Sequence, residues 1–312
     1  MKVYKYRGIS TLDRDLNTLV SNQFFAPTAE QLNDPVETVL NSQLAASLTE
    51  AIGEEVHELF NETVEMRKTV GIYSLSHTPY DELMWSHYGE SHEGFCIEYD
   101  LERLIFEART NWDIVDVIYS KTPPVLDFSE LLSGNGHKEL LRKLVGYKSK
   151  RWEYENELRI VTTRSGKNNY AEVAVTGIFF GCRCTEESIN QIRHALKGRL
   201  HEYFTVSYPE HSYDLKSSPL ERDKNIDGEP KKHRAPVEEF AISACGHSGN
   251  DSNLLKKIEK AVEIVRCDPS CELVVLGDIS ASKKDHICVM YETNVETGLD
   301  NTLSRFFPIH AL

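Results

Sequence analysis

The sequence predicts an α+β protein in which a mixed, strongly bent sheet with helices over residues 1–215 is followed by a small α/β unit over 237–312. Two observations predict this division. Strand-like and helix-like segments are interspersed along the first part, and a compact β-α-β-β pattern fills the last part. Between them, residues 216–236 (KSSPLERDKNIDGEPKKHRAP) carry charge, proline and glycine with almost no apolar residues, which is typical of a polar linker.

Strands are expected in the first part where short apolar or alternating runs end at turn residues. In chain order these runs are 3–9, 70–76, 95–99, 114–119, 158–161, 171–175, 177–181 and 204–208. Helices are expected where apolar residues recur at helical spacing or where a capping residue opens a run. These segments are 13–21, 36–68, 82–88, 101–108, 137–150 and 186–198, with Asp81 and Thr185 as caps. Residues 32–35 (LNDP) indicate a turn, because proline disfavours helix in the residue before it.

The last part of the chain is expected to contain a strand over 240–244 and an amphipathic helix over 253–265. Two further strands are expected over 272–276 and 287–291. Such a unit can recognise a target, bind a partner or inhibit the first domain, and its sequence does not choose among these roles.

The composition is that of an ordinary globular protein. A formal net charge of −14 argues against a general nucleic-acid or membrane coat, because phosphate binding needs clustered Lys and Arg. No run reaches the roughly 18 apolar residues of a membrane helix, and the N-terminus (MKVYKYRGIS) lacks the apolar core of a signal peptide. Seven scattered cysteines favour a reducing cytoplasm over a disulfide framework. No set of four Cys and His residues has the spacing of a zinc site, so no metal site is expected.

The segment Trp152-Glu153-Tyr154-Glu155-Asn156-Glu157-Leu158-Arg159 carries the strongest functional signal. Glu155 and Glu157 are two residues apart, so a strand would place both carboxylates on one face. Two carboxylates there repel each other and are costly to bury, which folding alone does not explain. They can orient a ribose hydroxyl or a nucleophile and stabilise positive charge at a sugar carbon. The structural alternative is a strand edge on which Arg151 and Arg159 neutralise the glutamates.

Three other constellations have both a functional and a structural interpretation. Arg7, at the end of the first predicted strand, can clamp a phosphate with two hydrogen bonds, or it is an exposed arginine beside a turn. Ser74 and Ser76 place two hydroxyls on one strand face, although serine is common at strand ends. His87 and Tyr88 line a pocket, or they are structural residues of a short helix.

Four sequence boxes occur in order. They are Asn33-Asp34-Pro35, Met84-Trp85-Ser86-His87-Tyr88-Gly89, His92-Glu93-Gly94-Phe95-Cys96-Ile97 and Trp152-x-Tyr154-Glu155-x-Glu157-x-Arg159. Together they resemble a bacterial family, domain of unknown function twenty-nine seventy-one, over roughly residues 1–210. The family label implies no activity. The boxes add Asn33, Asp34, His87 and Tyr88 to the residues expected around a cofactor site.

The order Arg7, Ser74-x-Ser76 and Glu155-x-Glu157 is also similar to ADP-ribosyltransferases of the Arg-Ser-Glu type. This resemblance implies NAD as the substrate cofactor, with its phosphates on Arg7 and its nicotinamide ribose region braced by Ser74 and Ser76. It also implies that Glu157 holds the ribose hydroxyl and favours the oxocarbenium-like transition state, while Glu155 activates the acceptor. We therefore expect these residues to converge on one site. If Arg7 and Glu157 lie on opposite faces of the sheet, the transferase interpretation fails.

The function that these signals predict is transfer of ADP-ribose from NAD, a small nucleotide substrate, to a macromolecule, as in a toxin or a phage-defence effector. Two alternatives stay open. A hydrolase or nuclease would place a divalent metal ion among Asp34, His87, Glu155 and Glu157. A non-catalytic sensor would form a ligand cage from Trp85, Tyr88, Trp152 and Tyr154.

Overall fold

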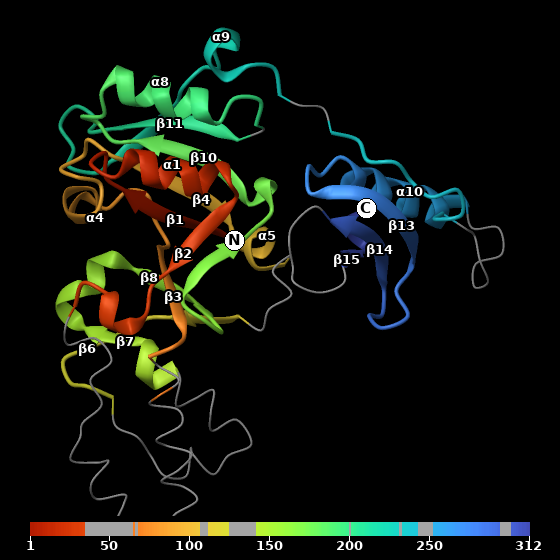
Figure 1. Cartoon of the computed structure of the whole chain (residues 1–312), viewed down its shortest axis with the longest axis horizontal. Coiled ribbons are helices and arrows are strands. Elements are labelled where there is room, and N and C mark those ends of the chain that lie inside the picture. Colours follow the sequence, from red (N-terminus) through yellow and green to blue (C-terminus); the bar gives the residue numbers. More distant parts are fainter. Residues whose placement is uncertain are drawn as a thin grey trace, which may run out of the picture.

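The computed structural model describes residues 1–34, 65, 68–106, 112–124, 142–199, 201–230, 233–242, 252–293 and 301–312. The fold is α+β, as the sequence predicts. A large mixed sheet builds the first part of the chain, and a separate small antiparallel sheet builds the last part (Figure 1). Among the described helices, none is long and apolar enough to cross a membrane.

The large sheet brings together strands that are far apart in the sequence. Its eight strands run in the order β12 (Lys216–Pro219), β11 (Glu202–Ser207), β10 (Val175–Phe180), β4 (Phe95–Asp100), β1 (Lys2–Arg7), β3 (Gly71–Ser76), β8 (Glu157–Thr162) and β5 (Asp113–Asp116). β10 and β11 are parallel, and the other neighbours pair antiparallel. The strands predicted to carry Arg7, Ser74 and Glu157 are therefore three neighbours, β1, β3 and β8.

The sheet opens between β1 and β3. These two strands share one register pair, Tyr4 opposite Ser76, whereas β1 pairs with β4 along its whole length and β3 pairs with β8 along its whole length. In Figure 1, β1, β4, β10 and β11 lie above the opening, and β3 and β8 lie below it. The residues of β1 after Tyr4 have no strand partner on β3. Side chains from both faces of the sheet can therefore reach the opening between the two strands.

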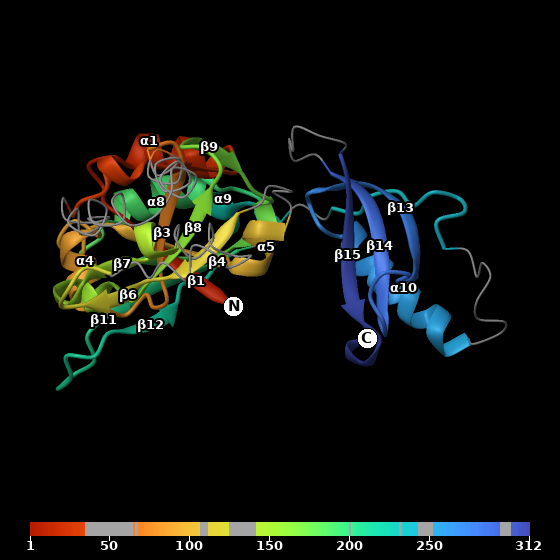
Figure 2. The ribbon, with the colours of Figure 1, turned by 90° about the horizontal axis from the view of Figure 1, so that it is seen from below.

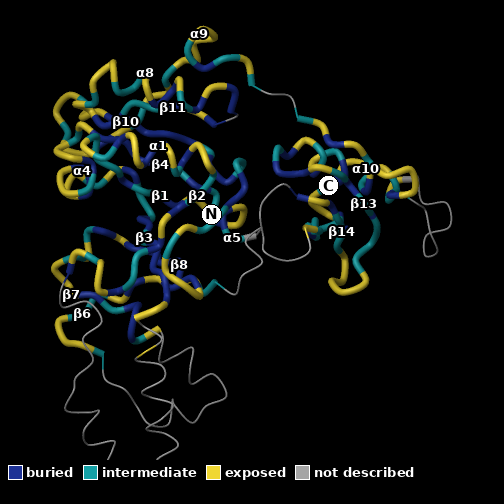
Figure 3. The backbone as a smooth tube through the Cα atoms, in the orientation of Figure 1, coloured by how far each residue is buried: buried dark blue, intermediate teal, exposed yellow. Residues whose placement is uncertain are grey.

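Helices cover both faces of this sheet. α1 (Leu12–Val20) and α8 (Glu186–Ala195) pack with α5 (Leu101–Phe106) on the face that carries Val3, Tyr73 and Leu158. α4 (Glu82–His87) covers the other face, where Trp85 packs on Tyr6. The buried segments in Figure 3 follow the central strands between these layers.

Local capping fixes the ends of two of these helices. The Asp81 carboxylate accepts the backbone N–H of Met84 at 2.9 Å, and the Thr185 hydroxyl accepts that of Ser188 at 3.2 Å. Each contact satisfies a helix N–H group that has no partner within the helix. Both predicted caps are therefore present.

Short elements connect the main strands. Two small ribbons form, one from β2 (Gln23–Ala26) and β9 (Gly166–Asn169), the other from β6 (Ile118–Ser120) and β7 (Tyr147–Ser149). The 3-10 turns are η1 (Ala29–Gln31), η2 (Lys150–Glu155), η3 (Glu172–Ala174) and η4 (Ile309–Ala311).

The last part of the chain packs one helix on a three-stranded sheet (Figure 2). α10 (Ser252–Arg266) contributes Ile258 and Val262 to a core with β13 (Cys271–Ile279), β14 (His286–Thr293) and β15 (Thr302–Pro308). β15 is an additional strand that the sequence did not predict. Residues 240–242 form a turn and a bend instead of the expected strand, and residues 243 and 244 lie outside the described residues.

Several local predictions are wrong for identifiable reasons. Glu155 lies on η2 and not on the strand, because Asn156 adopts a left-handed conformation (φ 43°) that separates the turn from β8. Within the predicted helix 137–150, residues 142–145 are helical and Lys148 lies on β7. The predicted strand 114–119 divides into β5 and β6. The predicted helix 36–68 lies outside the described residues except at Glu65 and Lys68.

Ordered elements also lie within the segment assigned to a polar linker. β12 pairs with β11 at the edge of the large sheet, and α9 (Lys224–Asp227) follows it. Asp227 is fully buried and forms an ion pair with Arg193 of α8, with oxygen–nitrogen distances of 2.6 and 3.0 Å. Residues 216–227 are thus packed against the first part of the chain.

Candidate functional site

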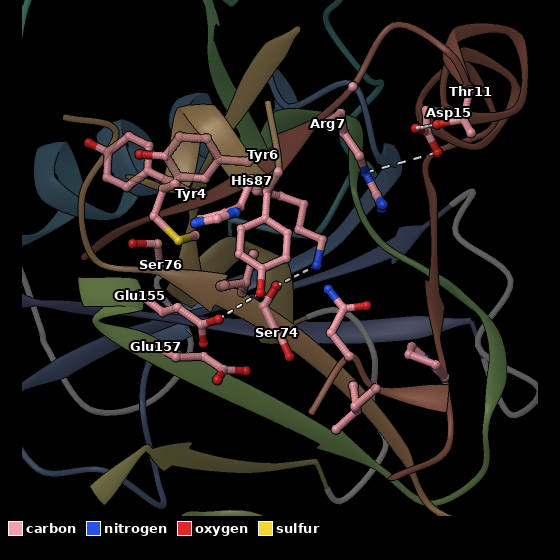
Figure 4. A pocket seen from close by; sticks show the side chains of 18 of the residues that line it. Tyr4, Tyr6, Arg7, Thr11, Asp15, Ser74, Ser76, His87, Glu155 and Glu157 are labelled. Atoms are coloured by element: carbon pink, nitrogen blue, oxygen red, sulfur yellow. Dashed lines mark hydrogen bonds and ion pairs between the residues drawn. The ribbon is translucent and has the colours of Figure 1, made fainter. Parts of the chain in front are cut away.

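A pocket of about 650 Å³ lies at the opening between β1 and β3 (Figure 4). Its wall comes from β1 and the loop that follows it, β3, α4, and the segment from β7 to β8. The sequence-predicted residues that line it are Arg7, Asn33, Ser74, Ser76, His87, Tyr88, Glu155 and Glu157. Asp34 is buried and does not line it.

Glu155 sits at the end of η2, where a lysine and a tyrosine hold its carboxylate. Lys148 Nζ donates to Oε2 at 2.5 Å, and the Tyr88 hydroxyl donates to Oε1 at 2.6 Å. Burial raises the pKa of Glu155 above its usual value, while Lys148 and Tyr88 act in the opposite direction. This carboxylate therefore takes up a proton more readily than an exposed glutamate, and it touches the pocket.

Glu157 opens β8 and is held differently. Arg159 Nε and Nη2 donate to its two carboxylate oxygens at 2.9 and 3.0 Å, and Lys148 Nζ lies 3.6 Å away. Burial alone would raise the pKa of Glu157, but the Arg159 guanidinium and the Lys148 ammonium outweigh it and lower the pKa to about 2. Glu157 is therefore ionised throughout the physiological range.

Arg7 lies across the opening from the glutamates. Its Nε is 4.0 Å from the Asp15 carboxylate of α1. Burial alone would lower the pKa of Arg7, but Tyr73 and Asp15 raise it overall, so the guanidinium stays charged. A guanidinium carries five N–H donors, and the contacts of Arg7 with Asp15 and Tyr73 leave some of them for an anionic ligand.

Arg7 and Glu157 belong to opposite faces of the sheet. Arg7 lies opposite Phe95 on the face covered by α1, whereas Glu157 lies opposite Ser76 on the face covered by α4. By the criterion set from the sequence, this arrangement speaks against the transferase interpretation. Here both side chains line the same pocket, because β1 and β3 separate beyond the pair of Tyr4 and Ser76.

The two serines and His87 play different parts in the pocket wall. Ser76 is almost fully buried, and its hydroxyl accepts the backbone N–H of Thr78 at 3.3 Å. Ser74 is half-buried, and its hydroxyl helps to lower the pKa of Glu157. His87 is exposed at the end of α4, with its ring centroid 6.0 Å from that of Tyr154.

The site contains residues that sequence reasoning missed. Lys5 lines the pocket from the same face of β1 as Arg7, and Lys148 neutralises the carboxylate pair. The signal for Lys5 was available, because Lys5 shares one strand face with Val3 and Arg7, and lysine is rarely found on a strand face that packs against the core. Tyr119 was also missed, and its hydroxyl accepts the backbone N–H of Glu157 at 2.8 Å.

The rim of the pocket includes a strained loop after α4. Glu90, Ser91 and His92 have positive φ angles of 48°, 55° and 69°, which non-glycine residues rarely adopt in succession. The loop places Glu90 Oε2 2.7 Å from the backbone nitrogen of Ser10, whose N–H it accepts. Such strain persists only where the surrounding structure holds it, and it clusters at ligand sites.

The aromatic residues do not form one cage around the pocket. Trp85 is fully buried, and its Nε1 donates to the Pro79 carbonyl at 2.7 Å. Tyr88 lines the pocket, but Trp152 and Tyr154 do not. Among the described residues, no group of three His, Cys, Asp or Glu side chains is arranged to hold a metal ion.

Fold and site together define an α+β protein with a charged pocket of small-molecule size in an opened sheet. Residues 84–160 match the family model described as "Protein of unknown function (DUF2971)", which confirms the family resemblance over this stretch. The match contains residues 84–87 of α4, all of β4 and the two pocket glutamates. The Asn33-Asp34-Pro35 box lies outside it. No curated protein and no solved structure matches the chain.

Proposed function

We propose that the pocket binds NAD and that the chain is an ADP-ribosyltransferase-like enzyme that modifies a macromolecule. The observation that carries this proposal is the convergence of Arg7, Ser74 and Glu157 from three neighbouring strands on one pocket. A volume of about 650 Å³ falls within the range of about 300–1,000 Å³ usual for ligand and cofactor sites.

The charges in the pocket suit cleavage of the nicotinamide–ribose bond. As that bond breaks, nicotinamide leaves with the electron pair and positive charge develops at the sugar carbon. Glu157, ionised throughout the physiological range, would stabilise this charge, and the cationic Arg7 would hold the diphosphate. The Arg159 contacts occupy only part of the carboxylate's four lone-pair sites, so Glu157 can still accept a ribose hydroxyl.

Glu155 would act on the acceptor. A general base must lie at the pocket surface and have a pKa closer to neutrality than that of an exposed carboxylate. Burial raises the pKa of Glu155, and its side chain lines the pocket. It would take the proton of the acceptor nucleophile as that nucleophile attacks the sugar carbon.

The test is incubation with NAD labelled in its adenosine part, in the presence of cell lysate. We expect release of nicotinamide and transfer of label to a macromolecule, and both should be lost with Glu157→Gln. Glu153→Gln is the matched control, because Glu153 lies in the same segment with its side chain 58% exposed and outside the pocket. Tryptophan fluorescence verifies folding of each variant. NAD cleavage that is undiminished in folded Glu157→Gln would contradict the assignment of the catalytic residue.

A second function, non-catalytic ligand sensing, is favoured by one observation. Both pocket glutamates are already engaged in short ion pairs, with Lys148 and with Arg159, as in a rigid binding site. Saturating titration with NAD, without turnover, and weaker binding by Glu155→Gln would support a sensor over a transferase.

A further inference from the structure

We propose that Lys5 is a reactive amine that forms an imine with a phosphorylated aldehyde or ketone bound in this pocket, with Arg7 holding the phosphate. This goes beyond the proposed function and does not depend on it. A carbonyl compound needs only an unprotonated amine within reach and an anchor for its anionic group.

The position of the amine carries the argument. Lys5 lies half-buried in the pocket wall, and its Nζ donates to the Ser74 carbonyl at 2.7 Å. Nζ also lies 4.9 Å from the centroid of the Tyr73 ring. The carbonyl contact exists because β1 and β3 separate here and leave that oxygen without a strand partner on β1. Lys5 is thus held at the opening, with its amine facing the pocket.

A comparison with the second lysine of the pocket shows why Lys5 differs. Lys148 Nζ lies 2.5 Å from Glu155 and 3.6 Å from Glu157, so it is held between two carboxylates. Within the described part of the chain, Lys5 has no carboxylate oxygen within ion-pair distance. Lys5 therefore lacks the carboxylate contacts at short distance that Lys148 makes.

The surroundings of Lys5 disfavour its charged form. Burial is the largest cause and the nearby Arg7 guanidinium the next, and together they lower the pKa of Lys5 to about 7. Glu157, Asp15 and Glu155 act in the opposite direction and do not outweigh these effects. Near neutral pH a substantial share of Lys5 is thus the neutral, nucleophilic amine.

The condensation balances without any oxidant or reductant. The nitrogen lone pair attacks the carbonyl carbon, the C–N bond forms, and a proton passes from nitrogen to the carbonyl oxygen. The second proton on nitrogen then passes to this hydroxyl, which leaves as water as the nitrogen lone pair forms the C=N bond. One water molecule is released per imine.

Arg7 is placed to hold the anionic end of such a ligand. Arg7 and Lys5 are alternate residues on one strand face, so their Cα atoms are about 7 Å apart. Arg7 is charged and has donors to spare beyond its contacts with Asp15 and Tyr73. Arg14 adds a second cationic side chain to the wall. The spacing suits a small carbonyl compound with a phosphate a few bonds from its reactive carbon.

The experiment uses pyridoxal 5′-phosphate as the probe and pyridoxal as its matched control without phosphate. The full-length chain is incubated with each at pH 7.5, borohydride reduces the C=N bond, and mass spectrometry maps the labelled lysines. We expect the main adduct on Lys5, with labelling by pyridoxal at least about tenfold weaker because charge-assisted contacts to phosphate are lost. Arg7→Gln should lower phosphate-dependent labelling by a similar factor.

Lys5→Arg should abolish the adduct, whereas Lys150→Arg should not, because Lys150 is 53% exposed and outside the pocket. The proposal is overturned if wild-type Lys5 is labelled no faster than exposed lysines such as Lys150, or if pyridoxal labels Lys5 as well as its phosphate does. Mapping on the wild-type chain decides the matter even if Lys5→Arg fails to fold. Labelling is read independently of NAD cleavage, so failure of either proposal leaves the other testable.

Discussion

Replacement of Arg159 with methionine removes the guanidinium that holds Glu157. The resulting loss in the free energy of unfolding follows from the geometry of the pair. Arg159 is fully buried, Glu157 is 5% exposed, and two hydrogen bonds of 2.9 and 3.0 Å join them. Removing one partner of a buried ion pair typically costs about 3–5 kcal/mol, because the other charge is left buried. Lys148, at 3.6 Å from Glu157, compensates in part. We expect Arg159→Met to lower the free energy of unfolding by about 3 kcal/mol at pH 7.

The acid dependence of stability gives a second measure of the same contact. In the folded chain the pKa of Glu157 is lowered from 4.5 to about 2. At about 1.4 kcal/mol per pH unit, this difference corresponds to about 3 kcal/mol. Because the folded pKa lies below the unfolded one, this stabilisation is fully present above pH 4.5. It is lost as the pH falls toward 2, where the folded carboxyl takes up its proton.

The assay is urea unfolding at a series of pH values between 7 and 2.5. The three tryptophans, Trp85, Trp112 and Trp152, all lie in the first part of the chain, so their fluorescence reports on the unit that holds the pair. The wild type should lose stability below pH 4.5 more steeply than Arg159→Met. Arg151→Met is the control, since Arg151 is exposed in the same segment. Equal stabilities at pH 7 and parallel acid profiles for wild type and Arg159→Met would refute the reasoning.

Three further predictions follow from local geometry. Gly94→Ala would place a Cβ atom 2.0 Å from the Arg7 carbonyl oxygen, so we expect the free energy of unfolding to fall by about 1–3 kcal/mol. An unchanged melting temperature would contradict this. Asp227→Asn leaves the buried Arg193 without its ionic partner and should lower the free energy of unfolding by about 3–5 kcal/mol. Unfolding is followed by tryptophan fluorescence. An unaffected transition would mean that α9 is not part of the first unit. Asp81→Ala removes the cap of α4 and should cost about 1 kcal/mol in urea unfolding; full stability would show that the cap contributes nothing.

The elements that the sequence predicts well are those with local signals. Asp81 and Thr185 mark the starts of α4 and α8 through their own side-chain bonds, and the alternation of Phe95 and Ile97 marks β4. β12 (KSSP) has no such signal, because it joins the sheet edge through main-chain bonds that do not depend on apolar side chains. β12 was therefore assigned to the linker.

The candidate site shows the same limit. Glu155 and Glu157 were found because a carboxylate pair is unusual beside an apolar strand. Lys148 falls in the helix predicted over 137–150, because a run of basic residues looks alike whether it faces water or reaches inward to Glu155. Which strands become neighbours around the site depends on pairs of residues 72 to 98 positions apart, and no local pattern in one sequence contains that information.

The opening beside β1 has a mechanical consequence. Along the eight strands, the half-sheet that ends at β1 and the half-sheet that begins at β3 are joined in register by Tyr4 and Ser76. A ligand that binds Arg7 and Glu157 at once would connect the two half-sheets across the opening. Ligand binding would then reduce local opening in strands that do not contact the ligand. Slower amide hydrogen exchange in β5 and β10 on saturation would report it.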